Sequence, residues 1–174
     1  MDGLGVAAIS LIPGYRPCDD IWMPVSGGSE GVVERALIGG RWRRRKTYFR
    51  SEDLLRYSLR LPVLDFHRVA LGYEEFFRLP ALWTVDPQAG RIETEFVVAA
   101  GLNCEARASF RDARNAAMAV AGSVDATCRE GAETVLQIVR PELLPLLPVP
   151  NCRGIDVNDS NWIFDGATWV LIDF

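Results

Sequence analysis

The stretch Arg153–Phe174 constrains the fold of this 174-residue chain more than any other part of it. Its sequence, RGIDVNDSNWIFDGATWVLIDF, contains two apolar runs, at residues 162–164 and 169–172, separated by Asp165-Gly166. An Asp-Gly pair between two runs of β-prone residues is a strong short-range signal for a β-hairpin. We therefore expect a hairpin here, with a polar loop in front of its first strand.

Three oxygen-bearing side chains flank the expected hairpin. Asn161 directly precedes the first strand, Asp173 ends the second, and Asp156 lies in the loop that leads in. Antiparallel pairing brings the start of the first strand beside the end of the second, so the three side chains can converge. An amide and a carboxylate are hard ligands of the kind that Mg²⁺ prefers. The remaining carboxylate is free to accept a proton from an attacking hydroxyl, or to orient it.

This spacing resembles the catalytic centre of the protein-kinase-like superfamily, in which an Asp, four residues and an Asn are followed by a hairpin and a closing Asp-Phe. The version here, D-V-N-D-S-N and then W-V-L-I-D-F, is most similar to the aminoglycoside/choline phosphotransferases and the RIO-type kinases. The resemblance implies an ATP-dependent phosphotransferase that uses ATP and Mg²⁺. In it Asp156 would be the catalytic residue, and Asn161 and Asp173 would hold the metal. On the residues alone, the alternative is an ordinary edge hairpin with polar turn residues.

The segment SGGSEGVVERALIGGRWRRRK, residues 26–46, predicts a glycine loop, a strand over 32–38, a tight turn and a returning strand over 41–49. Lys46, the only lysine among 19 basic residues, falls on that returning strand. With a short strand over 21–25, this order resembles the kinase N-lobe, where a glycine-rich loop covers the phosphates and a lysine contacts them. The resemblance implies that the nucleotide is bound by Gly27, Gly28, Gly31 and Lys46.

The expected fold class is α+β: a kinase-like N-lobe with an antiparallel sheet of about five strands over residues 1–98, and a partial C-lobe over 99–174 with helices, the catalytic loop and the terminal hairpin. Helices are expected over 51–61, ended by Pro62, and over 63–78. A hairpin is expected over 81–98 and a helical block over 104–140, divided at Gly122-Ser123. In the family a helix after the lysine strand supplies a Glu that pairs with the lysine. The candidates are Glu52, Glu74 and Glu75, and Asp173 is the alternative carboxylate expected to meet Lys46.

Three features depart from the family pattern. Arg43, Arg44 and Arg45 stand where apolar residues are usual, either as solvated arginines of an edge strand or as a basic strip for phosphate or acid groups. Gly154 replaces an orienting His. The family also continues past the Asp-Phe with an activation segment and a helical C-lobe that bind the acceptor. The sequence as given is therefore expected to be a fragment of a longer protein, or else a truncated relative that binds nucleotide without turnover.

The composition limits the kinds of binding partner that can be expected. The net charge of −4 gives no electrostatic case for nucleic acid, and the four cysteines form no CxxC pair that would suggest a metal knuckle. Residues 5–12 suggest a strand, not a signal peptide, so a cytoplasmic protein with reduced thiols is expected. No apolar run approaches the ~18 residues of a membrane span.

The identity of the hydroxyl acceptor stays open between a sugar, an aminoglycoside, a lipid-linked sugar and a protein serine. The alternative function is a non-catalytic α+β binding protein, such as a pseudokinase, an immunity-type protein or a scaffold.

Overall fold

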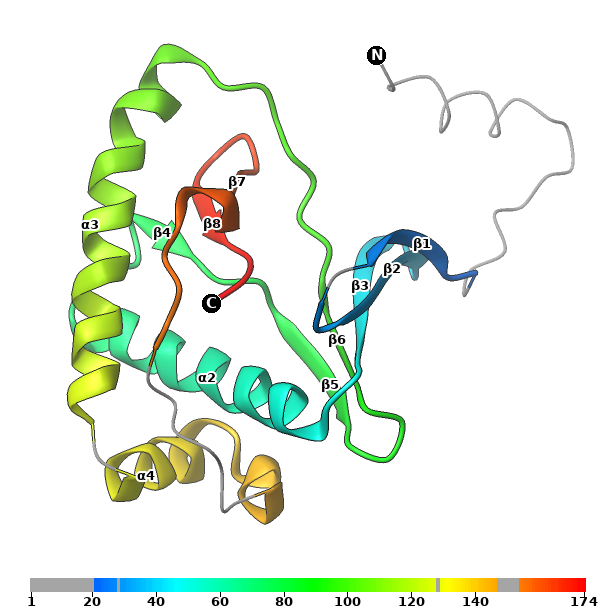
Figure 1. The fold of residues 1–174 in the computed structure, drawn as a ribbon. Coiled ribbons are helices and arrows are strands. Elements are labelled where there is room, and N and C mark those ends of the chain that lie inside the picture. The colour runs from blue at the N-terminus through cyan, green and yellow to red at the C-terminus, as the bar shows by residue number, and fades with distance from the viewer. Residues whose placement is uncertain (1–20, 28, 128, 147–153) are drawn as a thin grey trace, which may run out of the picture.

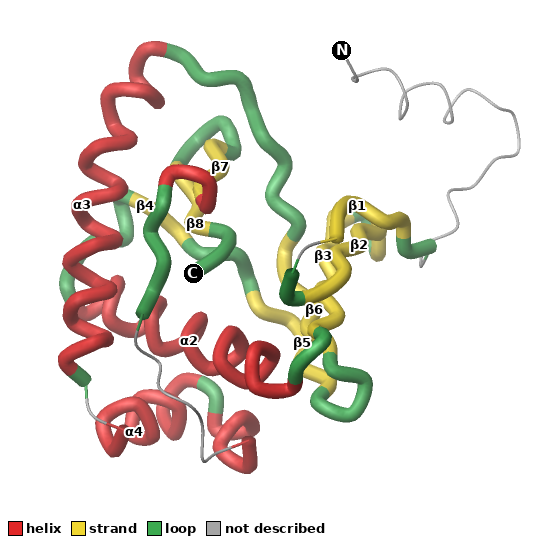
Figure 2. The backbone as a smooth tube through the Cα atoms, in the orientation of Figure 1, coloured by secondary structure: helices red, strands yellow, loops and turns green. Residues whose placement is uncertain are grey.

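The computed structural model describes residues 21–27, 29–127, 129–146 and 154–174, so the strand expected over residues 5–12 lies outside the described residues. The described part has an α+β fold with one five-stranded and one three-stranded sheet (Figure 1). In the view of Figure 1, α2 and α3 frame the smaller sheet, and the larger sheet lies to one side. The loop of residues 96–103 runs from the larger sheet back to α3 (Figure 2).

The larger sheet confirms the expected antiparallel arrangement of about five strands. Its order is β1-β2-β3-β6-β5. The β2–β3 hairpin turns at Gly39 and Gly40, whose φ angles of 56° and 74° are the left-handed values that such a two-residue turn requires. The strands are β1 (Met23–Gly27), β2 (Gly31–Ile38), β3 (Arg41–Tyr48), β5 (Leu82–Asp86) and β6 (Arg91–Glu95).

The terminal hairpin also forms as expected, from β7 (Trp162–Phe164) and β8 (Trp169–Leu171), paired antiparallel. A third strand, β4 (Phe77–Arg78), pairs parallel to β8 and was not expected. Two residues are too short to show a strand period, and the sequence instead suggested helix there. The fully buried Phe77 side chain, packed edge-on against Trp162, holds this segment against the hairpin.

The helix expected to end before Pro62 continues through it, so that prediction is wrong. α2 (Ser51–Ala70) is one helix with Pro62 inside, and the chain leaves it at Gly72, with a φ of 73°. A proline in a helix interior costs about 3 kcal/mol or more. Every residue from 57 to 64 is buried, and this burial on all sides of the helix compensates for the proline.

The helical block over 104–140 divides later than expected. α3 (Cys104–Ala126) begins with the Asn103 side chain accepting a hydrogen bond from Ala106 N at 2.7 Å, and it passes through Gly122 without a break. Its last turn is held on α2 by Ser123 Oγ, 2.8 Å from His67 Nδ1. The next helix, α4 (Arg129–Val139), leads into a 3₁₀ turn at Pro141–Leu146.

A single apolar cluster runs from the larger sheet through α2 to α3, α4 and the terminal hairpin. The cluster contains residues from both sides of the expected division between the N-lobe and the partial C-lobe, at residues 98 and 99. That division stays a prediction. Within the described ranges, no helix is both long and apolar enough to cross a membrane.

We predict that Gly31→Ala destabilises the fold while Gly101→Ala does not. A Cβ at Gly31 would lie 2.2 Å from the backbone oxygen of Thr47 on β3, whereas a Cβ at Gly101 would meet no atom within 4 Å. Overpacking of this kind costs roughly 1–3 kcal/mol, which lowers the melting temperature by about 2–4 °C per kcal/mol in a chain of this size. Thermal unfolding of both variants checks this. Equal melting temperatures would contradict it.

Candidate nucleotide and metal site

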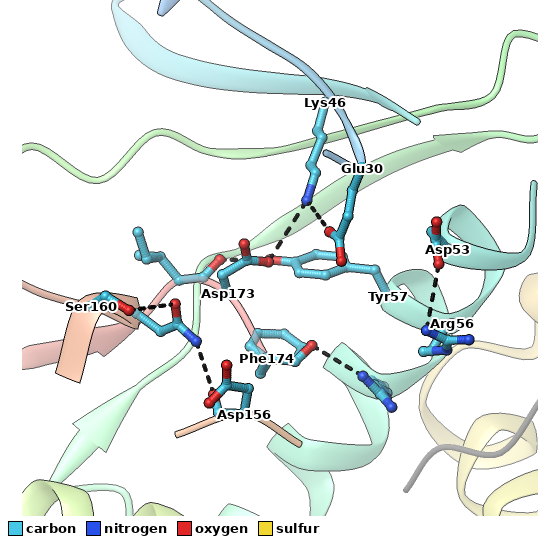
Figure 3. Close-up of polar contacts among 12 residues, drawn as sticks. Glu30, Lys46, Asp53, Arg56, Tyr57, Asp156, Ser160, Asp173 and Phe174 are labelled. Atoms are coloured by element: carbon cyan, nitrogen blue, oxygen red, sulfur yellow. Dashed lines mark hydrogen bonds and ion pairs between the residues drawn. The ribbon is translucent and has the colours of Figure 1, made fainter. Parts of the chain in front are cut away.

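Lys46 is the charged centre of the site. It lies on β3 in register with Val33 and Ile92, and only 5% of the residue is exposed. Its ammonium is 2.9 Å from Glu30 Oε2 and 3.8 Å from Asp173 Oδ1 (Figure 3). A buried ammonium is stable only with such countercharges. Lys46 Nζ also lies 4.6 Å from the centre of the Tyr48 ring.

Of the two carboxylate sources expected for Lys46, Asp173 is confirmed, and a Glu of the following helical region is wrong. In the described part of the chain, Lys46 forms its ion pairs with Glu30 and Asp173. Glu52 is exposed in the first turn of α2, and Glu74 and Glu75 are exposed in the turn beyond its end. Glu30 belongs to the glycine loop, and no local motif marks it as a partner of Lys46. The hydrogen bond from Lys46 lowers the pKa of Glu30, although burial opposes the shift.

The glycine loop lines a cavity beside Lys46. Gly31 starts β2 and, with Glu30, Lys46 and Asp173, lines a cavity of about 570 Å³. Gly27 ends β1, and Gly28 lies outside the described residues. A side chain at position 31 would collide with the backbone of β3. The packing of the sheet therefore already requires a glycine at this position.

The terminal hairpin brings the other site residues together. Ile172 N donates to Asn161 O at 2.8 Å, which places Asn161 beside the end of β8. Asn161 Nδ2 donates to Asp156 O at 3.2 Å, and Asp156 Oδ1 accepts from Asn158 N at 3.0 Å. A second, polar cavity of about 280 Å³ is lined by Asp156, Asn161 and Asp173. Asp173 therefore lines both cavities, as does Glu30.

Helix α2 holds the strand end that carries Asp173. The Tyr57 hydroxyl donates to Ile172 O at 3.0 Å, and its ring stacks on Phe174 with centroids 4.7 Å apart. Arg60 Nη1 donates to Phe174 O at 3.3 Å. Burial raises the pKa of Tyr57 to about 12, so the hydroxyl stays a donor at neutral pH. Sequence reasoning missed both residues, because their partners are more than a hundred positions away.

The donor set fits a magnesium ion. Asp173 has a side chain 43% exposed, and Asn161 is partly exposed beside it, so a carboxylate and an amide oxygen are available. Mg²⁺ is usually held by one or two protein oxygens together with phosphates and water. Among the described residues, no group of three or more His, Cys, Asp and Glu side chains could hold a metal ion. The fit therefore depends on this two-residue set.

The arginines before Lys46 do not form an edge strand, because β3 lies between β2 and β6. On one face Arg43 lies 4.5 Å from the centre of the Trp83 ring, and Arg45 pairs with Glu34 at 2.8 Å. Arg44 lies on the opposite face and lines the larger cavity. The edge-strand interpretation is therefore wrong, and of the three only Arg44 lines the described cavity around Lys46.

No protein-family model matches the sequence, and no curated protein matches it. Among solved structures, macrolide 2′-phosphotransferase MphH from Brachybacterium faecium is similar with a TM-score of 0.52 and 13% identity, over 96% of this chain and 70% of that chain. The streptomycin–ATP–APH(2″)-IIa ternary complex is similar with a TM-score of 0.41 and 11% identity, over 89% of this chain and 66% of that chain. This chain thus spans about two thirds of the length of these proteins. The likeness to the macrolide phosphotransferase shows that the chain has the protein-kinase-like fold.

Proposed function

We propose that the chain is an ATP-dependent phosphotransferase, or the nucleotide-binding part of one, that transfers the γ-phosphoryl group to a hydroxyl acceptor. The observation that carries this proposal is the 3.8 Å distance between the Lys46 ammonium and Asp173 Oδ1, a carboxylate that lines two cavities. Phosphoryl transfer asks a protein mainly for positioning and for charge neutralisation. A basic group beside a carboxylate that lines two cavities and would hold a metal ion can supply both.

In this proposal the larger cavity takes the nucleotide. Gly27, Gly28 and Gly31 cover the phosphates, and Lys46 binds the α and β phosphates. Asn161 and Asp173 would hold Mg²⁺, which when bound neutralises charge on the phosphates.

Asp156, exposed on the smaller cavity, orients the acceptor hydroxyl and accepts its hydrogen. A sugar, an aminoglycoside, a lipid-linked sugar and a protein serine all carry the hydroxyl that this role needs. Because the similar solved proteins are longer than this chain, turnover and acceptor choice are proposals for the whole protein.

Asp173→Asn should remove Mg²⁺-dependent ATP binding and leave the fold intact, because the amide keeps the shape of the side chain but loses the charge that attracts the cation. Thermal shift with ATP, with and without Mg²⁺, measures this, since a ligand at about 100 times its Kd stabilises by roughly 2.7 kcal/mol.

Asp159→Asn is the matched control, because this aspartate lies in the same segment with a side chain 69% exposed. The control should bind as the parent does. If Asp173→Asn bound Mg-ATP as tightly as the parent, the phosphotransferase proposal would have to be abandoned. A parent chain without any Mg²⁺-dependent shift would instead favour the non-catalytic binding protein.

Asp156→Asn should separate binding from chemistry. We expect nearly unchanged Mg-ATP binding and a loss of turnover in the whole protein, by a factor of roughly 10²–10⁴, because general acid–base catalysis contributes about that much. Binding titrations and a phosphate-transfer assay on the same preparation check the two halves. A variant that lost nucleotide affinity to the same extent as turnover would assign Asp156 to binding.

Glu30→Gln should tighten ATP binding. The Glu30 carboxylate contacts the Lys46 ammonium at 2.9 Å, where a nucleotide phosphate would bind in the proposed mode. The phosphate must therefore displace a charge-assisted hydrogen bond, and a neutral Gln lowers that cost. We expect a gain of several-fold in affinity by titration calorimetry, on the order of 1 kcal/mol. Weaker binding would show that Glu30 positions Lys46 and does not compete with the nucleotide.

A further inference from the structure

Arg78 joins two segments that lie far apart in the sequence. Its guanidinium donates to both carboxylate oxygens of Glu95, at 2.7 and 2.8 Å, and twice to Asp165 Oδ2, at 2.9 and 2.8 Å. The planar fork of arginine suits such a double contact, which a lysine cannot reproduce. The Arg78 side chain is 29% exposed, so the ion pairs are partly shielded from water.

The two carboxylate oxygens of Asp165 bind different partners. Oδ1 accepts from Ala167 N at 2.9 Å and from Thr168 N at 2.8 Å, which closes the turn of the β7–β8 hairpin. Oδ2 faces Arg78. Burial raises the pKa of Asp165, but the turn amides and the Arg78 guanidinium outweigh it and hold the pKa below its usual value. The turn is thus both formed and anchored by one ionised side chain.

Glu95, the other partner of Arg78, lies beside the cavity proposed for the nucleotide. Glu95 ends β6 and lines the larger cavity, and β6 pairs with β3 through Lys46 and Ile92. A second tie runs alongside, because Ala100 N donates to Phe164 O at 2.8 Å. The strand that carries Lys46 is therefore linked through Glu95 to the hairpin.

The β7–β8 hairpin is linked to the larger sheet at two places. Arg78 bridges the hairpin turn, at Asp165, and Glu95 at the end of β6. At the end of the hairpin, Asp173 Oδ1 lies 3.8 Å from the Lys46 ammonium on β3. The hairpin that carries Asp173 is held between the two. A shift at the turn must therefore change either the Lys46–Asp173 separation or the hairpin itself.

We propose that Arg78 is a positioning residue, which through Asp165 and Glu95 sets the place of Asp173 opposite Lys46 and so tunes Mg²⁺-dependent nucleotide affinity. This inference rests on the proposed function. Partners that orient metal ligands typically change metal affinity about 10–100-fold when they are removed.

The test compares ATP affinity in Mg²⁺ and in EDTA. Arg78→Ala should weaken binding about tenfold in Mg²⁺ and leave it unchanged in EDTA. Asp165→Asn should act in the same direction, because the Asn oxygen still accepts from the turn amides but loses its charge toward Arg78. Arg78→Lys should be intermediate, since a lysine can satisfy one carboxylate at a time. The double variant Arg78→Ala/Asp165→Asn should lose little more than either single variant, because both remove the same contact.

The matched control is Arg91→Ala. This arginine starts β6 in the larger sheet and pairs with Asp86 at 3.4 Å, with a side chain 40% exposed, away from the hairpin. Its removal should change neither affinity. A loss that is equal in Mg²⁺ and EDTA, or a lower melting temperature alone, would overturn the positioning role. It would leave Arg78 as a purely structural contact.

Hydrogen exchange without nucleotide separates the inference from the proposed function. The Ile172 amide, bonded to Asn161 O at 2.8 Å, should exchange faster in Arg78→Ala than in the parent and in Arg91→Ala. Unchanged exchange overturns the inference whatever the nucleotide data show. A parent chain that fails to bind Mg-ATP overturns the proposed function, and exchange then decides whether Arg78 still holds the hairpin in place.

Discussion

The buried ammonium of Lys46 is the interaction on which the rest of the cleft depends. Only 5% of this residue is exposed, and an unpaired charge at such a depth would cost several kcal/mol. The two carboxylates that balance it come from the glycine loop and from the terminal hairpin, at 2.9 and 3.8 Å. A single charge therefore ties two segments, more than a hundred residues apart in the sequence, to the same strand.

The helix after the lysine strand has a different task here from the one expected. α2 offers no glutamate to Lys46. It places Tyr57 and Arg60 against the backbone oxygens on either side of Asp173. The stack of Tyr57 on Phe174 adds an apolar contact to these hydrogen bonds. The helix thus orients the metal-binding candidate through its neighbours in the chain, and leaves the Asp173 carboxylate itself partly open to the cavities.

The two cavities follow from this arrangement, because the strand end with Asp173 lies between the glycine loop and the segment with Asp156. A phosphoryl donor on one side and a hydroxyl on the other would meet at this residue. Proximity of this kind can supply much of a reaction barrier without covalent chemistry by the protein. The proposed group transfer between two bound molecules depends on this arrangement.

Much of this could be predicted from local sequence. The Asp165-Gly166 hairpin, the Gly39-Gly40 turn and the order of strands around Lys46 depend on turn chemistry and on a period of two, which act over a few residues. Only the tertiary structure decided that a helix runs through Pro62, that Phe77–Arg78 forms a strand, and that Glu30 pairs with Lys46. Each of these outcomes depends on burial or on a countercharge supplied from elsewhere in the chain, and local propensity carries no information about either.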